Sequence, residues 1–94
     1  MRESKIQKEV CDYAESRGWR IERFINRGMP DRMLISQLGF ILFIEFKAPG
    51  EKPEKHQQDT IDDLWIRGHY TAVIDDVEEG KRLIDTHATR DGQE

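Results

Sequence analysis

The sequence predicts a single α/β domain whose elements follow the order α-β-β-β-α-β-α around a mixed central sheet. Three observations support this prediction: apolar residues at helical spacing near the N-terminus, a near-continuous apolar run at residues 40–46, and glycines where two of the helices should end. With 94 residues, the chain is long enough for one small domain and too short for two. We expect a domain at residues 1–85 and a flexible polar tail at residues 86–94.

The first half of the chain predicts one helix and three strands. Apolar residues on one helical face indicate a helix at residues 3–17, and Gly18 stands where a left-handed C-terminal cap belongs. Large apolar and charged residues nearly alternate at residues 19–26, which is typical of a half-exposed strand. A second strand is expected at residues 31–37. The apolar run at residues 40–46 then predicts a central strand covered on both faces.

The second half predicts a surface loop, two helices and one strand. Prolines, a glycine and alternating charges mark residues 48–55 as a loop. The loop leads into a helix that has an apolar face and ends at Gly68. A short fourth strand is expected at residues 70–74, after which Asp75 or Asp76 can cap a last helix.

Composition and charge exclude several classes of protein. A formal net charge of −4 argues against a protein that coats nucleic acid through bulk positive charge, so any nucleic-acid site must be local. The longest apolar run is too short to cross a bilayer, and the N-terminus lacks the apolar segment of a signal peptide. The single cysteine, Cys11, excludes an internal disulfide and a cysteine-based zinc site. We therefore expect a cytoplasmic protein that does not associate with membranes.

Two charged residues interrupt the most apolar stretch of the chain. Glu45 and Lys47 are two residues apart on one predicted strand, so their side chains share a face, while Phe46 points into the core. Asp31 begins the preceding antiparallel strand, which places its carboxylate across from Glu45. Two such carboxylates repel each other unless a cation lies between them, and oxygen ligands suit Mg²⁺. The alternative is an exposed ion pair beside an ordinary Pro-Asp turn, but buried charges are costly unless they are paired or bind metal.

The arrangement Pro30-Asp31, followed by Ile44-Glu45-Phe46-Lys47 on an apolar strand, resembles the signature of PD-(D/E)XK nucleases. Four blocks, "ESKIQKEV", "RFINRGMPDRML", "FIEFKAPG" and "KHQQDTIDDL", resemble in order and spacing the VRR-NUC domain, the virus-type replication and repair nuclease module. This resemblance implies a restriction-endonuclease-like core and a DNA endonuclease that depends on Mg²⁺ or Mn²⁺. It also implies that Asp31, Glu45 and the carbonyl of Phe46 bind the metal and that Lys47 is catalytic.

The resemblance also places a Glu or Gln of the first helix at the metal site. The candidates are Glu3, Gln7 and Glu9. At helical spacing, Gln7 and Glu3 fall on the apolar stripe, whereas Glu9 lies off its edge on the exposed side. We prefer Gln7 as the catalytic residue. Its alternative is a surface amide near the boundary of the core.

Candidate DNA contacts surround the first predicted strand, the turn before Asp31 and the start of the second helix. They are Arg23, Arg27, Arg32 and Gln57. The three arginines would supply the local positive charge that the chain lacks overall. Gln57 matches a glutamine that resembling sequences carry after the motif strand, where its amide could reach a phosphate. The alternatives are solvated arginines and an ordinary helix-surface glutamine.

Stand-alone members that this chain resembles are similar to archaeal Holliday-junction resolvases and often come from phages. The resemblance therefore implies a homodimer that cuts branched DNA. A non-catalytic DNA-binding or assembly module with the same fold is one alternative, which the intact Asp31, Glu45 and Lys47 disfavour. A sequence-specific restriction-type enzyme is another, and it is disfavoured because the chain has no long insertion with which to read base edges.

Overall fold

The structure, a computed structural model, describes residues 1–26 and 28–92, with side chains to residue 87. The order α-β-β-β-α-β-α is confirmed. The elements are α1 (Glu3–Ser16), β1 (Arg20–Arg23), β2 (Arg32–Ile35), β3 (Ile41–Phe46), α2 (Lys55–Ile66), β4 (Tyr70–Ile74) and α3 (Val77–Gly92). Within the described residues, no helix combines the length and apolar character needed to cross a membrane.

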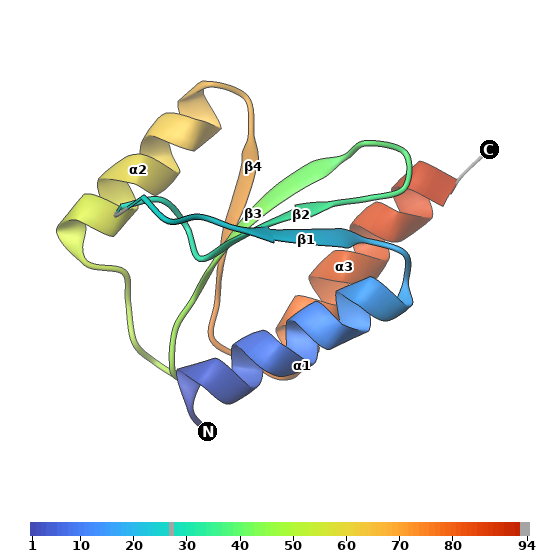
Figure 1. The fold of residues 1–94 in the computed structure, drawn as a ribbon. Helices are drawn as coiled ribbons and strands as arrows, with labels where there is room; N and C mark the ends of the chain where they lie inside the picture. Colours follow the sequence, from blue (N-terminus) through green and yellow to red (C-terminus); the bar gives the residue numbers. More distant parts are fainter. Residues whose placement is uncertain (27, 93–94) are drawn as a thin grey trace.

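The four strands form one mixed sheet in the order β1-β2-β3-β4 (Figure 1). β1 pairs antiparallel with β2, and β2 pairs antiparallel with β3. β4 returns after α2 to lie parallel to β3. β3 is therefore an inner strand, and all of its residues after Ile41 are buried. This confirms the central strand that the apolar run predicts.

The helices cover the two faces of the sheet unequally. α1 and α3 lie side by side on one face, whereas α2 lies on the other side, next to β4 (Figure 1). The main core fills the space between the sheet and the helix pair, and it contains Ile6, Val10, Ala14, Trp19, Leu34, Leu42, Ile44, Phe46, Ile74, Val77 and Ile84. Because alternate β3 residues belong to this core, the remaining residues of β3 face the side of α2.

Local signals place the helix ends as the sequence predicts. After α1, the N–H groups of Arg17 and Gly18 bond to the carbonyl oxygens of Ala14 and Glu15, and Gly18 has a φ of 89°. A side chain at this φ would be strained, so glycine suits the position. At the start of α3, Asp76 accepts a hydrogen bond from the N–H of Glu79, with an N···Oδ2 distance of 2.9 Å. Of the two aspartates considered, Asp76 is therefore the cap.

The first two strands are shorter than predicted, and the last helix is longer. β1 stops at Arg23 because its partner β2 begins opposite it, at Arg32. α3 runs to Gly92, so residues 86–92 of the expected polar tail are helical. Helical structure continues there because His87 is buried and its ring stacks on Phe40, with the centroids 4.3 Å apart. An aromatic anchor inside a polar segment holds this last turn against the sheet.

Candidate active site

The site lies at the end of β3, where the strand emerges from the core. Glu45 is only 2 % exposed, and the side chain of Lys47 is 13 % exposed. The Lys47 Nζ and Glu45 Oε2 atoms are 3.7 Å apart, which confirms that the two residues share a face. Phe46, between them, is fully buried in the core on the opposite face. The pair is therefore largely sheltered from water, unlike an ordinary surface ion pair.

Asp31 is held directly beside this pair. In the β2–β3 register Arg32 is opposite Ile44, so the next position places Asp31 opposite Glu45. The Oδ2 atom of Asp31 accepts a hydrogen bond from the backbone N–H of Phe46 at 2.8 Å. The preceding residue, Pro30, is buried and ends the turn that leads into the strand. The structure thus brings Asp31, Glu45 and Lys47 together, as predicted.

The electrostatics of the site favour a cation. Burial, followed by the negative charge of Asp31, raises the pKa of Glu45 to about 7, while the ammonium of Lys47 acts in the opposite direction. One lysine is therefore insufficient to neutralise the two carboxylates. A divalent cation between them would stabilise both in the ionised form.

The donor atoms fit such an ion. In a strand, the N–H and C=O groups of one residue point to the same edge, so the carbonyl of Phe46 lies on the side of Asp31. The Arg32–Ile44 pair is the last of the β2–β3 ladder, so this carbonyl lies beyond the ladder. Among the described residues, no three His, Cys, Asp or Glu side chains form a metal cluster. Two carboxylates and one carbonyl would leave the remaining coordination positions of the ion to water, as is usual for Mg²⁺.

α1 contributes a stripe of residues that faces this site. Burial and then the charge of Asp31 raise the pKa of Glu3. Burial raises the pKa of Cys11 to about 11, and that thiol also lies within range of the charges of Arg32 and Asp31. Gln7 is half-buried and lies one helical turn from each, so it shares their face.

Glu9 points elsewhere and forms an ion pair with Lys5, with an Nζ–Oε2 distance of 2.7 Å. The structure therefore favours Gln7 or Glu3 over Glu9 as the residue of α1 that reaches the site. Both residues fall on the apolar stripe that the helical spacing predicts.

Of the predicted DNA contacts, Arg23 and Arg32 are neighbours on paired strands, whereas Gln57 is engaged at the start of α2. Arg32 is half-buried, and its Nη1 atom donates to the carbonyl oxygen of Asp31 at 2.7 Å. Arg23 is exposed and lies opposite Arg32 in the strand register. Arg27 lies outside the described residues. The side-chain oxygen of Gln57 accepts the N–H of Glu54 at 2.8 Å, so this glutamine belongs to the capping box of α2.

Comparisons with known proteins agree with this geometry. No family model matches the chain. It is 36 % identical over 78 residues to a protein named "Putative nuclease p44" from Acyrthosiphon pisum secondary endosymbiont phage 1, an alignment that covers 80 % of this chain and 84 % of that protein. It is also similar to a solved structure described as a VRR_NUC domain, with a TM-score of 0.81 and 26 % identity, covering 88 % of this chain and 94 % of the other. The chain belongs to the VRR_NUC family of nucleases.

Proposed function

We propose that this protein is an endodeoxyribonuclease that hydrolyses phosphodiester bonds with the help of Mg²⁺ or Mn²⁺. One observation carries the proposal: the hydrogen bond from the N–H of Phe46 fixes Asp31 opposite the buried Glu45. Burying two carboxylates together next to a single lysine costs free energy unless a cation binds them. A cluster of charges that destabilises the folded protein is typical of a functional site.

Each residue of the site has a role in this proposal. Asp31, Glu45 and the carbonyl of Phe46 would hold the ion, which polarises the phosphate and lowers the pKa of bound water. Lys47, kept near Glu45 by their 3.7 Å contact, would donate to a phosphate oxygen or position the attacking water. The oxygen of water bonds to phosphorus as the bond to the leaving oxygen breaks, the water loses one proton, and the leaving oxygen takes one up. Gln7 would orient that water without adding negative charge to the site.

The proposed substrate is branched DNA, in particular the four-way junction, and the proposed active form is a homodimer. A core this small gains buried apolar area from a two-fold interface, which also sets two active sites on one symmetric substrate. Ile25 is 98 % exposed on the connection that leads to Asp31, and a contact there would bring the two sites together.

The test is a cleavage panel of linear, flapped, single-stranded and four-way DNA with Mg²⁺, Mn²⁺ or EDTA, run beside light scattering over a dilution series. We expect metal-dependent cutting of the four-way DNA by a dimer. Equal cutting of linear and branched DNA by a monomer of about 11 kDa would overturn the proposed substrate and the proposed dimer. The proposal that the protein is a nuclease would stand. Tight binding without cutting would overturn the nuclease and favour the non-catalytic module.

A further inference from the structure

A tight turn follows Lys47 directly. It consists of Ala48, Pro49, Gly50 and Glu51. The N–H of Glu51 donates to the carbonyl oxygen of Ala48 at 2.9 Å, and Gly50 has a φ of 83°. Proline at the second position and a glycine with positive φ at the third are typical of a type II β-turn. The chain therefore bends sharply immediately after the proposed catalytic lysine.

The turn is held by hydrogen bonds to the end of β4. Its last three residues are all exposed. The N–H of Gly50, which the turn's own hydrogen bond does not use, donates to Oδ2 of Asp75 at 2.9 Å. Just before the turn, the N–H of Lys47 donates to the carbonyl oxygen of Ile74 at 3.0 Å. Because packing gives an exposed turn little support, these two bonds determine where the segment after β3 lies.

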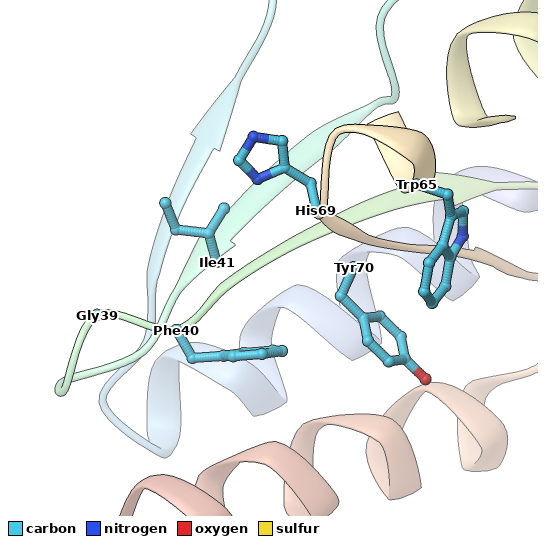
Figure 2. Close-up of a pocket in the computed structure, with 7 residues that line it drawn as sticks. Gly39, Phe40, Ile41, Trp65, His69 and Tyr70 are labelled. Carbon is cyan, nitrogen blue, oxygen red and sulfur yellow. The ribbon is translucent and has the colours of Figure 1, made fainter. Parts of the chain in front are cut away.

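β4 is a fixed support for this turn. It pairs with β3 along its whole length. At the other end of β4, Trp65 of α2 lies beside Tyr70 (Figure 2), with the ring centroids 4.9 Å apart. The indole N–H of Trp65 also donates to the carbonyl oxygen of Thr71 at 2.8 Å. A side chain that follows β4 is therefore anchored to the same sheet that carries Glu45.

Asp75 is the neighbour of Lys47 in the strand register. Phe46 is opposite Ile74, so the next position places Lys47 opposite Asp75. The direction of the lysine side chain depends on the backbone on both sides of it. On one side that backbone is β3, which the sheet fixes. On the other side it is the exposed turn, whose bond to Asp75 supplies the matching constraint.

We propose that Asp75 is a positioning residue for DNA cleavage. By accepting the N–H of Gly50, it holds the turn against the end of β4 and thereby keeps Lys47 directed toward the phosphate that is cut. The inference rests on the proposed function, because that function gives Lys47 its catalytic role. Displacement of a catalytic group by about 1 Å can slow a reaction by about 10²-fold. One hydrogen bond on the turn is therefore enough to affect the rate.

The cleavage rates of three variants test this role. Asp75→Ala should lower kcat roughly 10- to 100-fold, with an equal fall in kcat/KM, because Lys47 acts in the transition state. Asp75→Asn keeps a side-chain oxygen that can accept the N–H of Gly50, so it should recover most of the rate. Asp76→Ala is the matched control, because it removes the same kind of bond, from the N–H of Glu79, at the start of α3. It should lower Tm by about 4–8 °C but leave kcat unchanged.

Three further measurements show whether Asp75 acts through Lys47. In a double-variant cycle, Asp75→Ala should have no additional effect on cleavage once Lys47 is replaced by alanine. Amide hydrogen exchange in EDTA should show lost protection at Gly50 in Asp75→Ala, while the amides inside β3 keep theirs. Binding of Mn²⁺ should stay at the wild-type level, because Asp31 and Glu45 precede the turn.

Several results would overturn this proposal. They are an unchanged rate in Asp75→Ala, an equal loss in Asp75→Asn, and additive losses in the double variant. Weaker Mn²⁺ binding in Asp75→Ala would also overturn it, by making Asp75 a support of the metal site. Any of these results with a wild-type protein that cuts DNA would leave the nuclease standing. A wild-type protein that never cuts DNA would overturn the nuclease, and Asp75 would then serve the fold alone.

Discussion

The carboxylate of Asp31 accepts a hydrogen bond from the backbone N–H of Phe46 across the end of the β2–β3 ladder, at 2.8 Å. This bond replaces the next rung of the ladder, since strand pairing stops at Arg32 and Ile44. It joins a residue of the turn to the motif strand and fixes the separation of the two carboxylates. A structural hydrogen bond and a catalytic position therefore depend on the same side chain.

Asp31→Asn separates these two roles. The Asn carbonyl oxygen can still accept the Phe46 N–H, so we expect the protein to fold and melt close to wild type. Removing the negative charge should abolish metal-dependent cleavage and lower the pKa of Glu45, which Asp31 raises. Asp62→Asn is the matched control on the exposed face of α2 and should retain activity. Near wild-type turnover in Asp31→Asn would refute the assignment of Asp31 as a metal ligand.

Glu45 predicts an unusual dependence of stability on pH for the metal-free protein. Its pKa is about 7 when folded and near 4.5 in the unfolded chain, so the folded state binds more protons between these values. The contribution of Glu45 to the free energy of unfolding is fully present below about pH 4.5 and is lost as the pH rises through 7. The total loss is about 3 kcal/mol. The raised pKa of Glu3 acts in the same direction.

Denaturant unfolding at pH 5.5 and pH 8 in EDTA measures this effect. Glu45→Gln should flatten the difference and stabilise the metal-free protein at pH 8, because its side chain carries no charge to desolvate. Mg²⁺ should restore stability to wild type at pH 8 and have no effect on Glu45→Gln beyond that of ionic strength. A wild-type protein whose stability rises over this interval would contradict the electrostatic account of the site.

The position of Gln7 on α1 predicts how its substitution affects cleavage. Gln7→Ala should reduce cleavage more than Glu9→Ala, because Gln7 shares the stripe that faces Asp31 whereas Glu9 pairs with Lys5. Gln7→Glu should preserve or strengthen metal binding, since it adds a carboxylate ligand. Calorimetric titration with Mn²⁺ and initial cleavage rates test the two effects separately. If Glu3→Gln has the largest effect of the set, Glu3 is the residue of α1 that serves the site.

Much of this fold follows from patterns that act locally. The helical spacing of Ile6, Val10 and Ala14 identifies the buried face of α1, and the positive φ of Gly18 suits the predicted cap. The charged pair inside an apolar strand identifies Glu45 and Lys47 as candidates, because buried charges are costly unless they are paired or bind metal. These features depend on neighbouring residues and so can be read from the sequence.

Features that depend on residues far apart in the chain were not predicted. The helical continuation through His87 depends on rings contributed by Phe40 and Tyr70, which nothing in the polar segment itself indicates. Gln57 is a local exception: its side-chain oxygen accepts the N–H of Glu54, three residues earlier, in the capping box of α2. The sequence also did not decide which residue of α1 lies at the site. Helical spacing identifies the face of a helix but not which of its turns lies next to the site.

The close packing of α1 on α3 depends on Gly80. A Cβ atom at this position would lie 2.5 Å from Cγ2 of Val10, so Gly80→Ala forces the two helices apart or Val10 out of its rotamer. We expect a loss of about 1–3 kcal/mol in the free energy of unfolding, despite the better helix propensity of alanine. The double variant with Val10→Ala should lose less than the sum of the single variants, because the smaller side chain makes room. Additive losses in denaturant unfolding would rule out this contact as the cause.

Substitution of Lys47 should separate catalysis from metal binding. Its Nζ atom lies 3.7 Å from Glu45 Oε2 and lowers the pKa of that carboxyl, so its removal adds to the excess negative charge. Lys47→Ala should therefore bind Mn²⁺ at pH 8 at least as tightly as wild type, because the ion no longer competes with an ammonium. Cleavage should fall by about 10²–10³-fold, the usual effect of losing a group that stabilises the transition state or moves a proton. Lys52→Ala, in the exposed loop after β3, is the matched control and should change neither quantity. Parallel loss of Mn²⁺ binding and cleavage in Lys47→Ala would make the lysine a structural support of the carboxylates, whereas tight binding with lost cleavage would establish it as catalytic.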